Sequence, residues 1–193
     1  MDMREPIETP RTRLRRWEAR DGAAFHRLNS DAAVMRFFPF RRDRAQSDAM
    51  RDDLNRRVDR DGFSFLALEA RASGEVVGIV GMALLDPIMP AAPGVEIGWR
   101  LLPEVWGQGY ATEAAEACLD RAFAKPEPLA EIVSFCVETN AASEAVMLRL
   151  GFWREADFDH PKVDPATHPE LLRHRLYRIS RSRWLATRKP PAV

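Results

Sequence analysis

The residues with the clearest chemical potential form a glycine-spaced loop between an apolar stretch and an alanine-rich one. Gly107 and Gly109 have no Cβ, so a ligand can approach the main chain closely there, and Ala111 keeps a nearby position small. The helix expected after this loop begins with backbone N–H groups that have no partner within it, at the positive end of the helix dipole. Such a junction suits a phosphate or pyrophosphate. The alternative is a glycine-rich turn before an ordinary helix.

The spacing of this loop does not match two well-known nucleotide signatures. A P-loop requires Lys and then Ser or Thr after its last glycine, whereas Tyr110 follows Gly109 here. A dinucleotide fingerprint requires a third glycine where this chain has Thr112. The expected phosphate ligand therefore belongs to another class of fold.

The segment Trp-Gly-Gln-Gly-Tyr-Ala at residues 106–111 resembles the acetyl-CoA-binding signature of the GNAT superfamily of N-acetyltransferases, Gln/Arg-x-x-Gly-x-Gly/Ala. Trp106 departs from its first position. The longer stretch to residue 114 is similar to the RimJ/RimL-like branch, the ribosomal-protein N-terminal acetyltransferases. The resemblance implies that acetyl-CoA lies along the loop and along the extended main chain before it. The residues that it assigns to the cofactor there are Trp99, Leu101, Trp106, Gly107, Gln108, Gly109, Tyr110, Ala111 and Thr112.

A second motif stands at the start of a later helix, which should end at Gly151. Asn140 is a good N-cap residue and Ser143 falls in the first turn, so both can satisfy unpaired N–H groups. GNAT enzymes carry a similar segment, and the resemblance also places Asn140 beside the pantetheine arm of the cofactor. Many members have a tyrosine seven residues after this asparagine, which protonates the departing thiolate, but this chain has Met147. The resemblance to the RimJ/RimL-like branch gives that role, or a hydrogen bond to the sulfur, to Ser143.

The implied reaction requires mainly positioning, because an amine attacks the thioester directly once it is deprotonated and held in line. Backbone amides at the end of the strand before the loop can polarise the carbonyl. Glu96 is the first candidate for the base that accepts the ammonium proton. Its neighbours Val95 and Ile97 point to the opposite face of the strand, so burial can raise the pKa of Glu96. The open alternative is a polar residue on a wet sheet face.

Three histidines near the end of the chain offer further chemistry. His160, His168 and His174 are too unevenly spaced for a zinc site, and Cys118 and Cys136 do not complete one, so we expect no metal. We interpret His160 as a loop residue on the rim of the substrate site, with a role as base as the alternative.

Composition narrows the classes of function. The 193 residues suffice for one domain, expected over residues 1–193. The 29 basic and 29 acidic residues balance, which argues against nucleic acid and membrane surfaces as partners. Two cysteines without a disulfide framework and no apolar leader indicate a cytoplasmic protein. The acid-free segment from residue 173 to 189 is interpreted as a solvated strand and chain end, with contact to the adenosine 3′-phosphate or an RNA-rich partner as the alternative.

The elements that position these residues alternate between strand and helix patterns. Strands are expected at 11–17, 62–70, 75–85, from residue 95 to the glycine loop, and at 132–137 and 172–180. Helices are expected at 22–29 and 32–37 with Asp21 and Asp31 as N-caps, at 46–59, after the loop to about 125–126, and at 141–150. This order indicates an α/β or α+β sandwich. It matches the GNAT fold that the resemblance implies, a mixed, mostly antiparallel sheet of about seven strands flanked by helices.

The sequence thus predicts an enzyme that moves acetyl from acetyl-CoA to a primary amine within a ternary complex. Nothing in it resembles a nucleophile elbow or triad that would form an acyl-enzyme. The acceptor is either a protein N-terminus, as the branch implies, or a small-molecule amine. The alternative from another class is a non-catalytic acyl-CoA-binding sensor or partner module. The resemblance also offers a homodimer that shares an edge strand.

Overall fold

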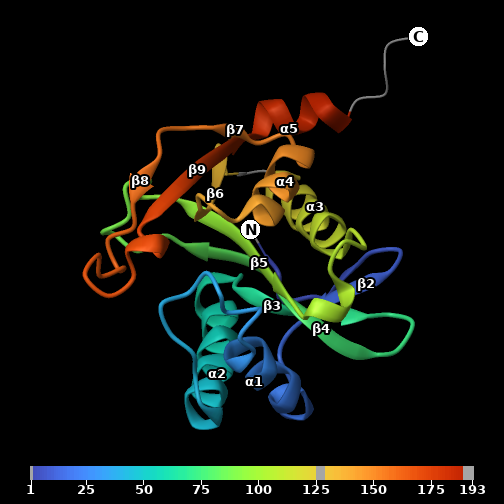
Figure 1. Ribbon diagram of the computed structural model, residues 1–193. Coiled ribbons are helices and arrows are strands. Elements are labelled where there is room, and N and C mark those ends of the chain that lie inside the picture. Colours follow the sequence, from blue (N-terminus) through green and yellow to red (C-terminus); the bar gives the residue numbers. More distant parts are fainter. Residues whose placement is uncertain (1, 125–128, 189–193) are drawn as a thin grey trace.

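The computed structural model describes residues 2–124 and 129–188, which form nine strand segments and five α-helices (Figure 1). The strands are β1 (Ile7–Glu8), β2 (Thr12–Arg15), β3 (Phe65–Ala70), β4 (Glu75–Leu84), β5 (Val95–Leu101), β6 (Glu131–Val137), β7 (Trp153–Arg154), β8 (Phe158–Asp159) and β9 (Arg173–Ser180). The α-helices are α1 (Gly22–Ser30), α2 (Arg44–Asp61), α3 (Tyr110–Phe123), α4 (Ala141–Arg149) and α5 (Arg181–Arg188). Short 3-10 helices span Ala19–Asp21, Pro103–Val105 and Pro169–Leu171.

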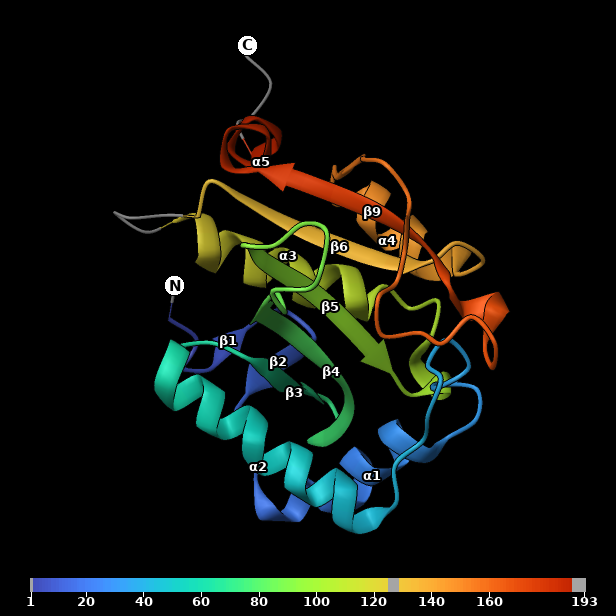
Figure 2. The same ribbon diagram turned by 90° about the vertical axis from the view of Figure 1, so that its left-hand side faces the viewer.

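The strands form one sheet in the order β1-β2-β3-β4-β5-β6-β9-β7, with β8 also paired to β9. All pairs are antiparallel except β5 and β6, which are parallel and align only at Glu96 and Val133. Figure 2 shows these two strands running apart toward their C-terminal ends. The predicted mixed, mostly antiparallel sheet is confirmed. The two-residue strands β1, β7 and β8 raise the number of segments above the seven expected, because segments so short leave no period-2 pattern.

Helices cover both faces of the sheet. Figure 1 shows α1 and α2 together on one face and α3 and α4 on the other. On the α3 face, small residues such as Ala114 and Ala115 let the helix approach the sheet closely, next to Leu66 and Ile97. On the α1 face, Phe25 packs edge-on against Trp17, with ring centroids 4.4 Å apart. In α1 and α3 an apolar stripe of the helix thus fits one side of the sheet.

The alternation along β5 divides its side chains between the two faces. Val95, Ile97 and Leu101 belong to the core beneath α3. Glu96, the intervening glycine and Arg100 therefore project from the opposite face, since successive side chains of a strand point to opposite sides. The predicted orientation of Glu96 away from its apolar neighbours is confirmed. This face of β5 is turned toward α1, α2 and the chain that joins them.

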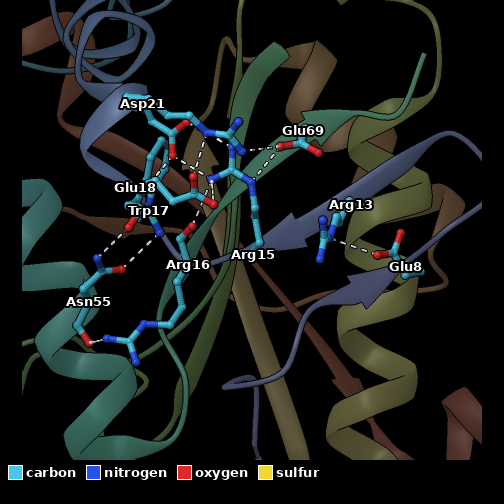
Figure 3. Close-up of polar contacts among 10 residues, drawn as sticks. Glu8, Arg13, Arg15, Arg16, Trp17, Glu18, Asp21, Asn55 and Glu69 are labelled. Atoms are coloured by element: carbon cyan, nitrogen blue, oxygen red, sulfur yellow. Dashed lines mark hydrogen bonds and ion pairs between the residues drawn. The ribbon is translucent and has the colours of Figure 1, made fainter. Parts of the chain in front are cut away.

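The predicted strand at 11–17 is confirmed as the shorter β2, and its arginines have specific partners (Figure 3). Arg15 is 5% exposed and its guanidinium donates to the Asp21 carboxylate at 2.6 and 3.0 Å and to Glu69 at 2.7 Å. This network lowers the pKa of Asp21, where the hydrogen bond from Arg15 and its charge together outweigh the effect of burial. Helix α1 is present as predicted, but the Asp21 side chain does not cap it, because Arg15 and the Glu18 amide occupy the carboxylate.

The helix predicted at 32–37 is wrong: this segment is a run of turns. Asp31 does bind amides as a cap residue would, accepting from Ala33 at 2.8 Å and Val34 at 3.1 Å. The turns cannot propagate because Pro39 lacks an N–H and disfavours helical geometry at Phe38. The chain therefore crosses from α1 to α2 as an extended loop, residues 31–43, hereafter the crossing loop.

The strand predicted at 172–180 is present as β9, but the solvated character expected of the segment from residue 173 onward is wrong within the described part, which ends at residue 188. Strand β9 pairs with β6 over seven positions, and its Tyr177 and Ile179 are buried. Helix α5 follows, with Trp184 3% exposed in the main core. The arginine content hid an amphipathic pattern in which the cations lie outside and every second or fourth residue is apolar.

The remaining boundaries agree closely with the predictions. Strand β3 begins at Phe65 rather than at 62, because Gly62 takes a φ of 82° as the C-cap of α2. The end predicted for the helix after the loop, at 125–126, lies outside the described residues. Within the described ranges, the structure contains no helix with the length and apolar character needed to cross a bilayer.

Candidate functional site

A cavity of about 1200 Å³ opens where β5 and β6 separate. It extends from the crossing loop, across β5, to the start of α3 and the first turns of α4. All twelve residues that the sequence assigned to cofactor or catalysis line it: Glu96, Trp99, Leu101, Trp106, Gly107, Gln108, Gly109, Tyr110, Ala111, Thr112, Asn140 and Ser143. The structure thus brings together residues from β5, the glycine loop and α4 that are up to 47 positions apart in the chain. Their individual roles stay predictions.

The glycine loop has the backbone geometry of an anion cradle. Gly107 and Gly109 both have positive φ angles, 73° and 82°, which other residues rarely adopt. Gly109 is the N-cap of α3 and provides no side chain to bind the first-turn amides. Among the described residues, the amides of 107–112 have no hydrogen-bond acceptor. These donors, at the positive end of the α3 dipole, face a cavity wide enough for a phosphate.

A residue from the turn between the first two strands holds this loop in place. Arg11, in the β1–β2 turn, donates to the Gln108 carbonyl at 2.7 Å and to the Glu113 carboxylate at 2.6 Å. Glu113 also accepts from the Arg11 amide and the Thr9 hydroxyl, and the hydrogen bonds lower its pKa against the effect of burial. Sequence reasoning missed Arg11, because its partners lie about a hundred positions away.

Other groups of the predicted cofactor site serve the loop itself. The Trp106 indole donates to the Leu101 carbonyl at 2.7 Å, and the Gln108 amide donates to the Glu104 carbonyl at 2.9 Å. Trp106 thereby ties the end of β5 to the loop, while 43% of it stays exposed. The Leu101 carbonyl is consequently already hydrogen-bonded to the Trp106 indole. A ligand that pairs with the main chain would therefore bind the part of β5 that precedes Leu101.

Asn140 has the capping geometry that the sequence predicted. Its side chain accepts from the Ser143 amide at 3.2 Å and so begins α4. The Ser143 side chain faces the cavity beside Cys136, where its hydrogen bond opposes the large upward pKa shift, to about 12, that burial gives the Cys136 thiol. Met147 is fully buried in the core, so its position does not reach the cavity. Tyr177 does not line the cavity either, and its hydroxyl donates to Glu144.

Glu96 lies in the wall of the cavity, largely shielded from water. Burial raises the pKa of its carboxyl from 4.5 to about 7, and the charges of Lys162 and Arg57 oppose this rise. Lys162 reaches the site from the β8–β9 connection, where its ammonium pairs with Asp86 at 2.6 Å. A carboxyl group that titrates near neutral pH can take up and release a proton under ordinary conditions.

Of the three histidines that the sequence analysis considered, two lie side by side in the structure and the third lies apart from them. His160 and His174 line the cavity with ring centroids 4.7 Å apart, next to Phe135. Burial, the second imidazole and Lys162 lower the pKa of His160 to about 4, so its ring is neutral at physiological pH. His168 lies elsewhere, against Thr167. In residues 2–124 and 129–188 no three His, Cys, Asp or Glu side chains gather as metal ligands.

The end of the cavity toward α1 and α2 contains residues that sequence reasoning did not single out. Arg36 and Arg42 reach it from the crossing loop and Arg100 from β5, among Phe38 and Phe40. The only sequence signal is that Arg100 is four positions after Glu96 in the same strand, and so shares its face.

The candidate site lies where β5 and β6, the one parallel pair among the described strands, separate, and α/β proteins commonly bind ligands at such a break in the strand order. The comparison with known families specifies the class. Residues 11–153 match the family model described as an acetyltransferase (GNAT) domain. The chain belongs to this family of acetyltransferases.

The chain is also similar in sequence to curated relatives and in fold to solved structures. The chain is 33% identical over 124 residues to the uncharacterized protein YkkB of Bacillus subtilis, a match that covers 64% of this chain and 71% of the relative. It is 34% identical over 123 residues to the FsC-acetyl coenzyme A-N(2)-transacetylase of Aspergillus fumigatus, a match that covers 62% of this chain but about half, 52%, of the fungal protein. A GNAT-family acetyltransferase from Bacillus anthracis superimposes with a TM-score of 0.76 at 23% identity over 92% of this chain and 99% of the other. The ribosomal L7/L12 alpha-N-protein acetyltransferase RimL, in complex with coenzyme A, has a TM-score of 0.74 at 19% identity over 91% and 98% of the two chains.

Proposed function

We propose that the protein transfers acetyl from acetyl-CoA to a primary amine by direct attack in a ternary complex. The observation that carries this proposal is the single cavity that joins the unpartnered amides of the glycine loop to a carboxyl group with a pKa near 7. An anionic donor and a proton acceptor are the two components that an amine acetylation needs. The fungal relative, whose name states acetyl coenzyme A and an N(2) position, supports the same chemistry.

The donor would lie along β5 with its pyrophosphate in the cradle. From Gly98 to Trp99 the edge of β5 toward β6 has no strand partner among the described residues, because the two strands pair only at Glu96. The amides of a pantetheine arm can pair with this edge as an added strand would. Asn140 and the Ser143 hydroxyl line the far side of the cavity, where the thiol end would arrive.

The transfer itself needs few groups. The amine nitrogen attacks the thioester carbonyl carbon, the carbon–sulfur bond breaks, and CoA leaves as its thiolate. Glu96 accepts the proton of the incoming ammonium, directly or through water. Ser143 supplies a hydrogen bond to the departing sulfur. The second proton, which the attacking nitrogen loses as the amide forms, passes to the CoA thiolate through the Ser143 hydroxyl or through solvent, so that the hydroxyl is regenerated. Tyr177 is held by Glu144 outside the cavity, so it does not replace Ser143 in this scheme.

The acceptor class has two candidates. Likeness to RimL and to a ribosomal-protein-serine acetyltransferase from Vibrio cholerae, at 19% and 17% identity, supports a protein N-terminal amine and the RimJ/RimL-like branch. The fungal relative, at higher identity over a shorter stretch, supports an amine of another kind.

The decisive experiment measures acetyl-CoA-dependent release of CoA against peptide N-termini, amino acids, polyamines and aminoglycosides, with mass spectrometry to identify the acetylated product. We expect one class of acceptor to gain about 42 mass units, the difference when one acetyl group replaces a hydrogen atom in a single direct transfer. Binding of acetyl-CoA without release of CoA from any member would contradict the enzyme and favour an acyl-CoA sensor, a role that the buried Met147 at the usual tyrosine position would suit.

A further inference from the structure

The α1–α2 end of the cavity contains arginines without acidic partners. Arg42 and Arg100 both line it, and neither forms an ion pair with any residue that the structure describes. The shielded Arg15, by contrast, binds two carboxylates. The charges of Arg42 and Arg100 are close enough to interact, and together with burial this lowers the pKa of Arg100 to about 10.

Each guanidinium is held by uncharged groups. Arg100 contacts the Met35 sulfur at 2.8 Å and the Leu28 carbonyl at 3.5 Å, and its Cζ lies 5.1 Å from the centre of the Phe38 ring. Arg42 stacks on Phe40 in the same way, at 4.3 Å. Aromatic rings and sulfur orient a guanidinium but do not neutralise it. Two oriented, partly desolvated cations therefore lack a counter-ion, and burying charge in this state is unfavourable.

These arginines lie on the acceptor side of β5 rather than with the cradle. Arg100, Gly98 and Glu96 project from the face opposite to α3, while the cradle amides belong to the α3 end. Gly98, between the two charged residues, leaves room for the Phe65 ring, which lies 3.3 Å from the place where a Cβ would stand. Arg36 is different, because its guanidinium lies over Trp106 of the glycine loop, 5.8 Å from the ring centre. Arg36 therefore belongs with the glycine loop and not with Arg42 and Arg100.

We propose that Arg100 and Arg42 bind a carboxylate of the acceptor, so that the substrate is a small amine that also carries an acid, such as an amino acid with a side-chain amine or a short peptide. This inference rests on the proposed acetyl transfer at Glu96. A planar guanidinium binds a carboxylate through two parallel hydrogen bonds, which fixes orientation as well as charge. Glu96 and Arg100 are four residues apart in a strand, about 13 Å between Cα atoms. The amine and the carboxylate of the acceptor therefore stand toward opposite ends of the molecule.

The same two cations disfavour polycationic acceptors. A polyamine or an aminoglycoside would bring further positive charge beside Arg42 and Arg100. Glu96 is the acid that β5 contributes to the cavity lining, whereas Glu113 and Glu116 line the cavity from α3. Like charges repel strongly where water is scarce.

The test compares pairs of acceptors that differ only in the acid: dipeptides and amino acids with a side-chain amine, each with a free carboxylate or as the C-terminal amide. Steady-state kinetics and calorimetric binding to the protein saturated with CoA are measured for each pair. We expect the free acids to have about a 10- to 100-fold advantage in kcat/KM and in binding, as a charge-assisted hydrogen-bonded pair provides. In Arg100→Gln and Arg42→Gln this ratio should fall toward one, and Arg100→Lys should retain part of it.

Arg41→Gln is the matched control, because Arg41 is exposed in the same loop and does not line the cavity. It should keep the full ratio. Equal kcat/KM and equal binding of acids and amides by the parent protein would overturn the inference. It would also be overturned if both arginine variants lost affinity only for acetyl-CoA and kept the ratio between acids and amides. Absence of turnover with every acceptor would contradict the proposed function instead, and the calorimetric ratio would still decide the carboxylate subsite.

Discussion

A single carboxyl group, that of Glu96, decides the pH dependence expected of the proposed reaction. The base must be ionised to accept a proton, and burial raises the pKa of Glu96 to about 7. Acetyl transfer should therefore increase as the pH rises through about 7, as the carboxyl loses its proton. Glu96→Gln should lower kcat by about 10²- to 10⁴-fold, the usual contribution of a general base, and abolish this limb of the pH–rate profile. Binding of acetyl-CoA should persist.

Thermal unfolding supplies the control for this variant. The folded-state pKa of Glu96 lies above its ordinary value of 4.5, so the stability that the neutral carboxyl contributes is fully present below pH 4.5 and lost as the pH rises through 7. Glu96→Gln should consequently match the parent at a pH of about 4 and exceed it at about 8. A variant with an unchanged pH–rate profile would show that another group, such as water or His160, accepts the proton.

Ser143 should contribute less than Glu96, because a serine hydroxyl is a poor acid. We expect Ser143→Ala to reduce kcat by about 3- to 30-fold, the loss of one or two kcal/mol of hydrogen bonding to the sulfur, with little change in the Kd of acetyl-CoA. Single-turnover kinetics and calorimetry separate the two quantities. Ser182→Ala, at an exposed position on α5, is the control. An unaltered turnover in Ser143→Ala would reduce this residue to a helix-cap position.

At the scale of elements, the cradle is a conformation rather than a set of side chains. Gly107 and Gly74 form a matched pair, with φ angles of 73° and 71° and open space, free of any atom within 4 Å, where a Cβ would stand at either position. Glutamate at either site should therefore cause the same backbone strain. Gly107→Glu also places a carboxylate where the pyrophosphate is expected, so it should weaken acetyl-CoA binding by at least about 100-fold, whereas Gly74→Glu should not. Equal affinities in calorimetry would refute the cradle assignment.

The elements also show which parts of the site the sequence could predict. Local rules determine the geometry of three parts of the site, which made these parts predictable. Glycine permits the positive φ angles of the glycine loop, strand alternation sets the side on which Glu96 lies, and helix capping places Asn140. The crossing loop was not predictable, since whether Asp31 starts a helix or a turn depended on Pro39 eight residues later. The roles of three arginines depend on contacts that only the fold creates, so the sequence could not predict them. Arg11 binds groups about a hundred positions away, whereas Arg42 and Arg100 have no acidic partner among the described residues.

At the scale of the whole molecule, the divergence of β5 and β6 creates the cavity but also removes hydrogen bonds that would hold the two halves of the sheet together. Helices that contact both halves of the sheet must compensate for these missing hydrogen bonds. Helix α3 packs against β4 and β5, and α5 packs on both α3 and β9. Figure 1 shows α5 at the C-terminal end of β9, with α3 and α4 nearby. The C-terminal helix is therefore a structural link between the two halves.

Trp184 makes this link testable. It is 3% exposed, and its indole donates to the Asp120 carboxylate of α3 at 2.9 Å, which Arg188 also binds at 2.9 Å. Trp184→Ala should lower the free energy of unfolding by about 3–5 kcal/mol, the range for truncating a buried aromatic side chain. Leu185→Ala, one position later and 37% exposed, should cost less than about 1 kcal/mol. Denaturant unfolding measures both, and similar small losses would mean that α5 contributes little to the fold and that the sheet holds its divergent strands without it.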